Sequence, residues 1–183
     1  MRITVLLMIL CLSAPAVAQS GSIDPGERIA SFVLGMPASR ALGIGAGLYG
    51  TAMGAQDCTS TEEQAAGRRC LYRVWWTYVA TGREVLGLEA HGPAGEERVE
   101  MVLTSNPAHR TEEGVGPGVR LDMFAQAYGQ PPVTGERFVL KTMRMATVIP
   151  YLENGAWWPA RGLGVIHGRE SRIVHRVLVF AKQ

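Results

Sequence analysis

Four short motifs occur twice in this chain in the same order, and they constrain its fold more than any other feature. Each half holds a tyrosine–glycine pair, a tryptophan pair, an apolar–glycine–apolar run and an arginine that opens an apolar run. The first set is Tyr49-Gly50, Trp75-Trp76, Leu86-Gly87-Leu88 and Arg98-Val99, and the second is Tyr128-Gly129, Trp157-Trp158, Leu163-Gly164-Val165 and Arg172-Ile173. Leucine and glycine match easily by coincidence, but the two tryptophan pairs contain all 4 tryptophans of the chain. The spacing predicts an internal duplication with a repeat of about 80 residues.

Hydrophobic patterning gives the first half a helix followed by strands. Pro37 can open a helix that runs to Tyr49, although Gly43, Gly45 and Gly47 inside it each cost about 1 kcal/mol relative to alanine. Apolar residues then alternate in three runs, which predict an antiparallel meander. These runs cover residues 71–79, 84–90 and 98–104.

The second half repeats this content. Leu121, Phe124, Ala125 and Tyr128 recur at i, i+3, i+4 and i+7, which predicts a helix that Gly129 ends. Asn154-Gly155 is typical of a hairpin turn. We expect strands over residues 138–140, 145–151, 163–167 and 172–180.

The expected architecture is therefore α+β, with two tandem repeats that each pack a short helix on an antiparallel β-meander. The repeats cover residues 29–104 and 119–183. The stretch 105–118 is rich in glycine and proline and predicts a linker between them, while the polar stretch 19–28 predicts a disordered lead-in.

Each predicted helix is also framed by turn motifs. Leu34-Gly35-Met36-Pro37 opens the first unit, and Gly114-Val115-Gly116-Pro117-Gly118 precedes the second helix, which Tyr128-Gly129-Gln130-Pro131 closes. This order resembles the helix-plus-sheet envelope modules of the outer-membrane assembly lipoprotein BamE and the tandem-repeat beta-lactamase inhibitory proteins. The resemblance covers most of residues 29–180 and implies a similar fold and a tendency toward protein–protein contact. It transfers no catalytic residue.

The first 18 residues predict a cleavable secretory signal peptide. Arg2 gives a positive start, an apolar run extends from Ile3 to Leu12, and Ala16-Val17-Ala18 supplies the small residues that a signal peptidase needs. A retained anchor is the alternative, but the run is shorter than the roughly 20 residues that span a bilayer. We expect a periplasmic or secreted protein with no transmembrane segment after cleavage.

Two cysteines, Cys58 and Cys70, remain after this cleavage. In an oxidising compartment such a pair predicts a disulfide, which by the loss of chain entropy would stabilise the fold by roughly 3 kcal/mol. A redox or metal site is the alternative. Redox pairs are usually Cys-x-x-Cys, and no histidine lies near enough in the sequence to complete a metal set.

Charge does not favour nucleic acid as a partner. The chain has 18 basic and 16 acidic residues, which are mixed along its length without a basic patch or an acidic tail. A protein partner in the cell envelope is the expectation that remains.

No motif in the sequence assigns catalysis, a metal or a cofactor. The run Gly45-Ala46-Gly47-Leu48-Tyr49-Gly50 matches a dinucleotide fingerprint as a string, but no parallel βαβ pattern surrounds it. None of the 4 histidines has metal-ligand spacing. His91 and His167 precede glycine at equivalent places in the repeats, either as an inherited turn position or as a paired site.

The tryptophan pairs are the candidate binding residues. Because side chains alternate along a strand, one indole of each pair should face the core and the other should face outward. We expect Trp75 and Trp157 to be the outward members, since exposed aromatic residues anchor protein contacts. The predicted function is a non-enzymatic protein-binding or envelope-associated module. A binder of small ligands or cell-wall fragments, or a hydrolase whose residues are dispersed in the sequence, are the alternatives.

Overall fold

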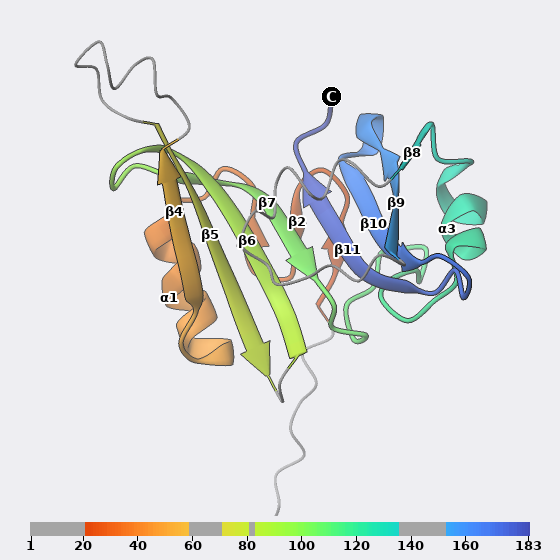
Figure 1. Cartoon of the computed structure of the whole chain (residues 1–183), viewed down its shortest axis with the longest axis horizontal. Helices are drawn as coiled ribbons and strands as arrows, with labels where there is room; N and C mark the ends of the chain where they lie inside the picture. Colours follow the sequence, from red (N-terminus) through yellow and green to blue (C-terminus); the bar gives the residue numbers. More distant parts are fainter. Residues whose placement is uncertain (1–20, 59–70, 81–82, 136–152) are drawn as a thin grey trace, which may run out of the picture.

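One long antiparallel sheet forms the centre of the protein (Figure 1). The structure is a computed structural model, and it describes residues 21–58, 71–80, 83–135 and 153–183. The strand order is β4-β5-β6-β7-β11-β10-β9-β8. The strands are β4 (Met53–Cys58), β5 (Leu71–Ala80), β6 (Arg83–Pro93), β7 (Arg98–Thr104), β8 (Val133–Gly135), β9 (Glu153–Trp158), β10 (Leu163–Gly168) and β11 (Val174–Phe180).

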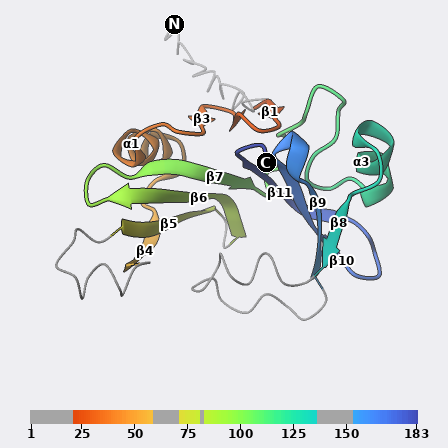
Figure 2. The ribbon, with the colours of Figure 1, turned by 90° about the horizontal axis from the view of Figure 1, so that it is seen from above.

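Two helices and a small sheet cover one face of this long sheet (Figure 2). The helices are α1 (Ala38–Tyr49) and α3 (Leu121–Tyr128), and the small sheet contains β1 (Ile23–Asp24), β2 (Arg28–Ile29) and β3 (Phe32–Val33). The predicted α+β class is therefore confirmed. No helix in the described part of the chain is long and apolar enough to cross a bilayer.

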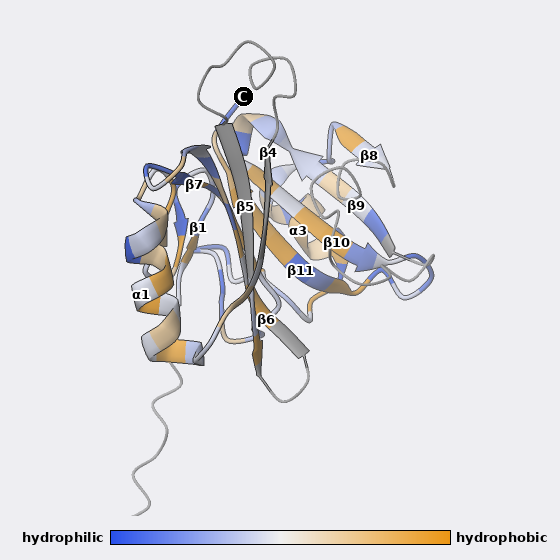
Figure 3. Cartoon of the chain, turned by 60° about the vertical axis from the view of Figure 1, so that its left-hand side comes forward, coloured by the Kyte–Doolittle hydropathy of each residue, from blue (hydrophilic) through white to orange (hydrophobic). Residues whose placement is uncertain are grey.

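The main core lies between the long sheet and the elements that cover it. Phe124 of α3 and Phe32 of β3 are fully buried there, together with Leu163 of β10 and Val177 of β11. Figure 3 shows the hydrophobic colour that runs along β10 and β11. Burial of apolar surface on this face gives the sheet its fixed orientation toward the helices.

The two halves of the sheet have the same order and register around their junction. Gly87 in β6 is paired with Leu103 in β7, and Gly164 in β10 is paired with Leu178 in β11. Leu103 and Leu178 are themselves paired where β7 meets β11. The strand ladder is therefore related by an approximate two-fold axis at the Leu103–Leu178 pair. Equal meanders can share a register without common ancestry, so the duplication stays a prediction.

The register changes which aromatic residues correspond between the halves. Leu86 is paired with Tyr78 and Leu163 is paired with Trp158, so Trp158 corresponds to Tyr78 rather than to Trp76. The sequence motif aligned the tryptophan pairs two residues out of register.

The helix α1 forms despite its three glycines because one of them packs closely. A Cβ on Gly45 would lie 2.1 Å from Cζ and from Oη of Tyr78, whereas a Cβ on Gly43 or Gly47 would meet no atom within 4 Å. Gly45 therefore lets the helix approach the aromatic ring on β5, and the backbone entropy cost of this glycine is offset by packing.

The N-terminal stretch corrects one prediction. Residues 19–28 were expected to be a disordered lead-in, but residues 21–28 are ordered and Ile23 is fully buried. The N–H groups of Gly26 and Phe180 both donate to the carbonyl of Gly162, at 3.2 and 3.0 Å. This carbonyl joins the first segment of the structure to its last strand.

A second correction concerns the predicted hairpin turn. Asn154 and Gly155 lie inside β9, where they are paired with His167 and Ile166. Tertiary pairing with β10 overrides the local turn preference of this dipeptide. The strands expected over residues 138–140 and 145–151 lie outside the described residues.

Candidate functional site: the helix-free face and the sheet edges

The sheet face opposite the helices carries a second, smaller apolar cluster. We call it the helix-free face, and its buried residues are Met101, Leu103, Trp157, Ile166 and Leu178. Trp157 is 3% exposed, and its ring centroid lies 6.1 Å from that of Phe180. Gly164 permits this packing, since a Cβ there would lie 2.1 Å from Cζ3 of Trp157.

The position of Trp157 corrects the sequence prediction in one respect. Trp157 and Trp158 do face opposite sides of the sheet, as alternation requires. Trp157 is nevertheless buried in the apolar cluster, because residues on both faces of β9 are enclosed. It is not an exposed anchor for a partner.

Trp158 closes the core beneath α3. Its Nε1–H donates to the carbonyl of Gly129 at 2.9 Å, and its ring packs against Phe124 and Tyr128. Tyr78 has the matching place in the first half, where its ring lies 5.8 Å from that of Tyr49. Both aromatic residues therefore fix the C-terminal part of a helix to the sheet.

Trp75 lies in β5, where its backbone is paired with Glu89 of β6. Its side chain lies outside the described part of the structure, so its predicted role as an outward anchor stays a prediction.

The two histidines that share a repeat position are not brought together. His91 lies near the end of β6, with Nδ1 3.6 Å from Oε1 of Glu100. His167 is buried near the end of β10, where Nδ1–H donates to the carbonyl of Gly168 at 3.0 Å. Since β6 and β10 are separated by two strands and run in opposite directions, their ends lie at opposite sides of the sheet.

The predicted disulfide joins a residue of the described sheet to a residue outside the described part of the chain. Cys58 is the last residue of β4 and is paired in the ladder with Tyr72, whereas Cys70 lies outside the described residues. The Cys58–Cys70 disulfide therefore stays a prediction.

The two ends of the sheet present exposed apolar residues at matching positions. Met53 opens β4 and is paired with Thr77, while Val133 opens β8 and is paired with Trp157. Met53 is 65% exposed and Val133 is 46% exposed. Among the described residues, β4 is paired with β5 alone and β8 with β9 alone. Each edge therefore offers backbone donors and acceptors to another extended chain.

A tyrosine–carboxylate pair lies on the surface beside α3. The hydroxyl of Tyr128 donates to Oε2 of Glu113. Burial and the Glu113 carboxylate raise the pKa of Tyr128 above its ordinary value. Partial burial alone would raise the pKa of Glu113, but the hydrogen bonds from Tyr128 and from its own backbone, with Arg161 nearby, lower that pKa on balance. No sequence signal pointed to Tyr128 as the partner of Glu113.

Metal chemistry gains no support from side-chain geometry. Within residues 21–58, 71–80, 83–135 and 153–183, no three histidine, cysteine or acidic residues gather in an arrangement that could hold an ion.

Comparisons with known proteins identify no family for this chain. No protein-family model matches it, and no curated protein matches it. A solved structure of the uncharacterized protein YfeY from Escherichia coli is similar with a TM-score of 0.47 and 7% sequence identity. The match covers 87% of this chain and 97% of that one.

Proposed function

We propose that the protein is an exported, non-enzymatic binding protein of the cell envelope, which takes up an extended segment of a partner protein along the edge strand β4. The observation that carries this proposal is that β4, with the exposed Met53 at its start, is paired with β5 alone among the described residues. Main-chain hydrogen bonds along such an edge supply affinity, and side-chain contacts at alternate positions supply specificity.

The composition of β4 supports its choice over the opposite edge. Natural sheets protect their edges with proline, lysine, bulges or very short strands. The strand β8 has only 3 residues and follows Pro131-Pro132. By contrast, β4 has 6 residues and contains neither proline nor lysine. Met53 is also the most exposed of the large apolar side chains in the described part of the chain.

The same proposal includes the internal duplication and the kinship with the BamE and beta-lactamase inhibitory modules. Support for the duplication comes from the tyrosine that ends each helix and packs on the sheet, Tyr49 on Tyr78 and Tyr128 on Trp158. Their separations, 79 and 80 residues, agree more closely than those of the sequence motifs.

Photo-crosslinking from single positions tests the binding proposal. A photoreactive residue at position 53 should form a covalent adduct with one envelope protein in living cells, and mass spectrometry should locate the bond in an extended segment of that protein. Position 123 on α3 is a matched control, because Met123 is also exposed, at 45%, but lies on a helix. Equal adducts from positions 53 and 123, or none from position 53, would contradict the edge proposal.

A thermal-shift screen separates this function from its alternative. A ligand that binds the folded state raises the melting temperature by mass action. Stabilisation by cell-wall fragments, together with no crosslink from position 53, would favour a ligand-binding function.

Export has its own test. Mature protein purified from an expressing cell should begin at Gln19, which N-terminal sequencing detects. A chain that keeps Met1 and stays in the cytoplasmic fraction would contradict export.

A further inference from the structure

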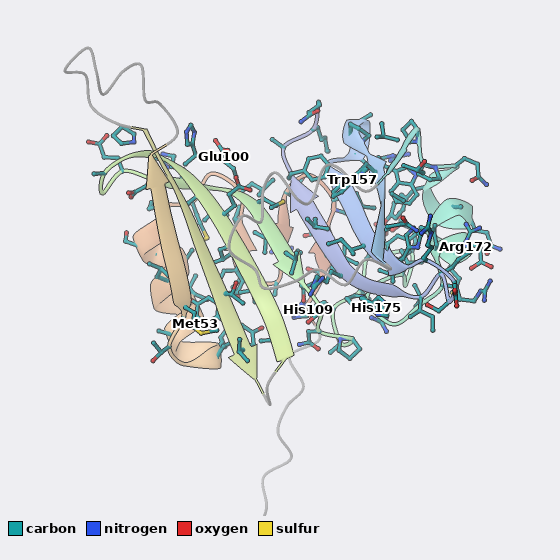
Figure 4. The ribbon with its side chains drawn as sticks, in the orientation of Figure 1. Met53, Glu100, His109, Trp157, Arg172 and His175 are labelled. Carbon is teal, nitrogen blue, oxygen red and sulfur yellow. The ribbon has the colours of Figure 1, made fainter. Side chains whose placement is uncertain are left out.

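The buried histidine His109 lies in the loop between β7 and α3 and has no part in the proposed binding edge (Figure 4). It is 2% exposed. A free imidazole changes its charge near neutral pH, so the surroundings of a buried one decide what a change of pH does to the fold.

Hydrogen bonding around Thr104 indicates which ring nitrogen carries the proton. Its Oγ1 accepts the N–H of Asn106 at 3.1 Å and lies 3.3 Å from the carbonyl of Val85, to which the hydroxyl donates. One lone pair of Oγ1 then remains, and it faces Nδ1 of His109 at 2.8 Å. Because a hydroxyl has one proton and two lone pairs, this arrangement is complete when Nδ1 is the donor. The next proton would therefore enter at Nε2.

The N-terminal segment covers that side of the ring. A Cβ on Gly21 would lie 2.8 Å from Nε2 and 2.7 Å from Cδ2 of His109, so the backbone of Gly21 packs directly on the imidazole. Two backbone hydrogen bonds join the segment to Arg110 at this point. The N–H of Ile23 donates to the carbonyl of Arg110 at 2.7 Å, and the N–H of Arg110 donates to the carbonyl of Gly21 at 3.2 Å.

The charged group that acts on the ring has the wrong sign to stabilise a proton. The guanidinium of Arg110 donates to the carbonyls of His109 and Pro117 at 2.9 and 3.1 Å. Burial, and secondly this positive charge, lower the pKa of His109. Thr104 from β7 and Gly21 from the N-terminal segment contact the ring and are uncharged, as is Asn106, whose N–H donates to Thr104.

We propose that His109 is a pH-sensitive latch: its neutral ring stabilises the docking of the N-terminal segment Gly21–Met36 on the sheet, and a proton taken from solvent at Nε2 weakens that docking. A charge at Nε2 must gain water or a hydrogen-bond acceptor, and the backbone packed against it is Gly21, the first residue of this segment. Further along, backbone hydrogen bonds at Gly26, Gly35 and Met36 and buried apolar side chains also hold the segment on the rest of the molecule. Movement of that segment exposes its fully buried side chains, which include Ile23, Ile29 and Phe32.

Hydrogen exchange of the mature protein tests the latch. Protection factors of residues 23–34 should fall at least about tenfold between about pH 7.5 and pH 5, while those of α3 change by less than about threefold. In His109→Asn, whose amide can still donate toward Thr104, this selective fall should disappear. His175→Asn is the matched control, because His175 is exposed and its loss should leave the fall unchanged.

A further variant weakens the same contact without a change of pH. Gly21→Ala places a methyl group against the ring and should lower the protection of residues 23–34 at both pH values, with the protection of α3 unchanged. A uniform fall across the wild-type molecule would overturn the proposal, and so would a selective fall that persists in His109→Asn. The wild-type measurement alone decides whether the loss of protection is selective for residues 23–34, even if a variant does not fold.

Discussion

Glycine has two opposite roles within the single helix α1. Gly45 lies against the ring of Tyr78, where even one added carbon would collide. Gly43 and Gly47 face open space and only add conformational freedom to the unfolded chain. Sequence reasoning assigned the same cost to all three, because propensity does not record which helix face approaches the sheet.

Alanine substitutions should separate these roles. Gly43→Ala and Gly47→Ala should each raise the free energy of unfolding by up to about 1 kcal/mol. Gly45→Ala should lower it by about 1–3 kcal/mol, because the new Cβ must displace Tyr78 or the helix. Chemical denaturation of the three variants measures this. A stabilising Gly45→Ala would show that α1 does not pack on Tyr78 as described.

The Tyr128–Glu113 hydrogen bond should make the stability of the protein depend on pH. The folded-state pKa of Glu113 is lowered, so its contribution to stability is present above the unfolded pKa and is lost as pH falls through the folded value. Tyr128→Phe removes the hydroxyl donor and should return the carboxyl pKa toward its ordinary value. Carboxyl titration by NMR measures the shift, and an unchanged pKa in the variant would refute the role of Tyr128.

Elements with strong local patterns were predictable. The helix over residues 121–128 and the strand over residues 98–104 have the predicted bounds. The elements that sequence reasoning missed depend on distant partners. The strand β1 has only 2 residues and is held by β2 and by Arg110, and β9 absorbs a turn dipeptide because β10 lies beside it.

The candidate site was less predictable than the fold, for a related reason. The sequence showed correctly that Trp157 and Trp158 face opposite sides, but periodicity cannot distinguish an exposed face from a second buried face. The edge position of Met53 could not be predicted either, because the residue pattern of a single strand does not indicate where that strand lies in a sheet.

The predicted disulfide between Cys58 and Cys70 can be tested directly by chemical labelling of the thiols. Unreduced mature protein should resist alkylation at both Cys58 and Cys70, and reduction should expose both thiols and lower the free energy of unfolding by roughly 3 kcal/mol. The double variant Cys58→Ser with Cys70→Ser should be insensitive to reductant. Free thiols in protein purified under oxidising conditions would refute the prediction.

The two halves of the long sheet meet at the Leu103–Leu178 pair, which lies on the approximate two-fold axis. Both side chains are at most 2% exposed. Leu103→Ala and Leu178→Ala should each lower the free energy of unfolding by about 2–5 kcal/mol. Because the two residues are in register with one another, the double variant should depart from additivity by about 0.5 kcal/mol or more.

Denaturation monitored in both halves provides the check. The two halves should unfold in one transition in the wild-type protein, since they share one sheet and both contribute to the main core. Separate transitions for the α1 side and the α3 side would show that the halves are independent units.

The shared carbonyl of Gly162 affects when the protein can complete its folding. It receives a hydrogen bond from Gly26, near the start of the structure, and another from Phe180, near its end. A packing arrangement completed by both ends of a chain cannot close until the last residues are free to join it, and such long-range closure is slow. In the exported protein that we propose, the N-terminal segment would cross the membrane first and could not complete its packing until the C-terminal strand had crossed. The chain would therefore stay unfolded, as threading through a translocation channel requires, until export is complete.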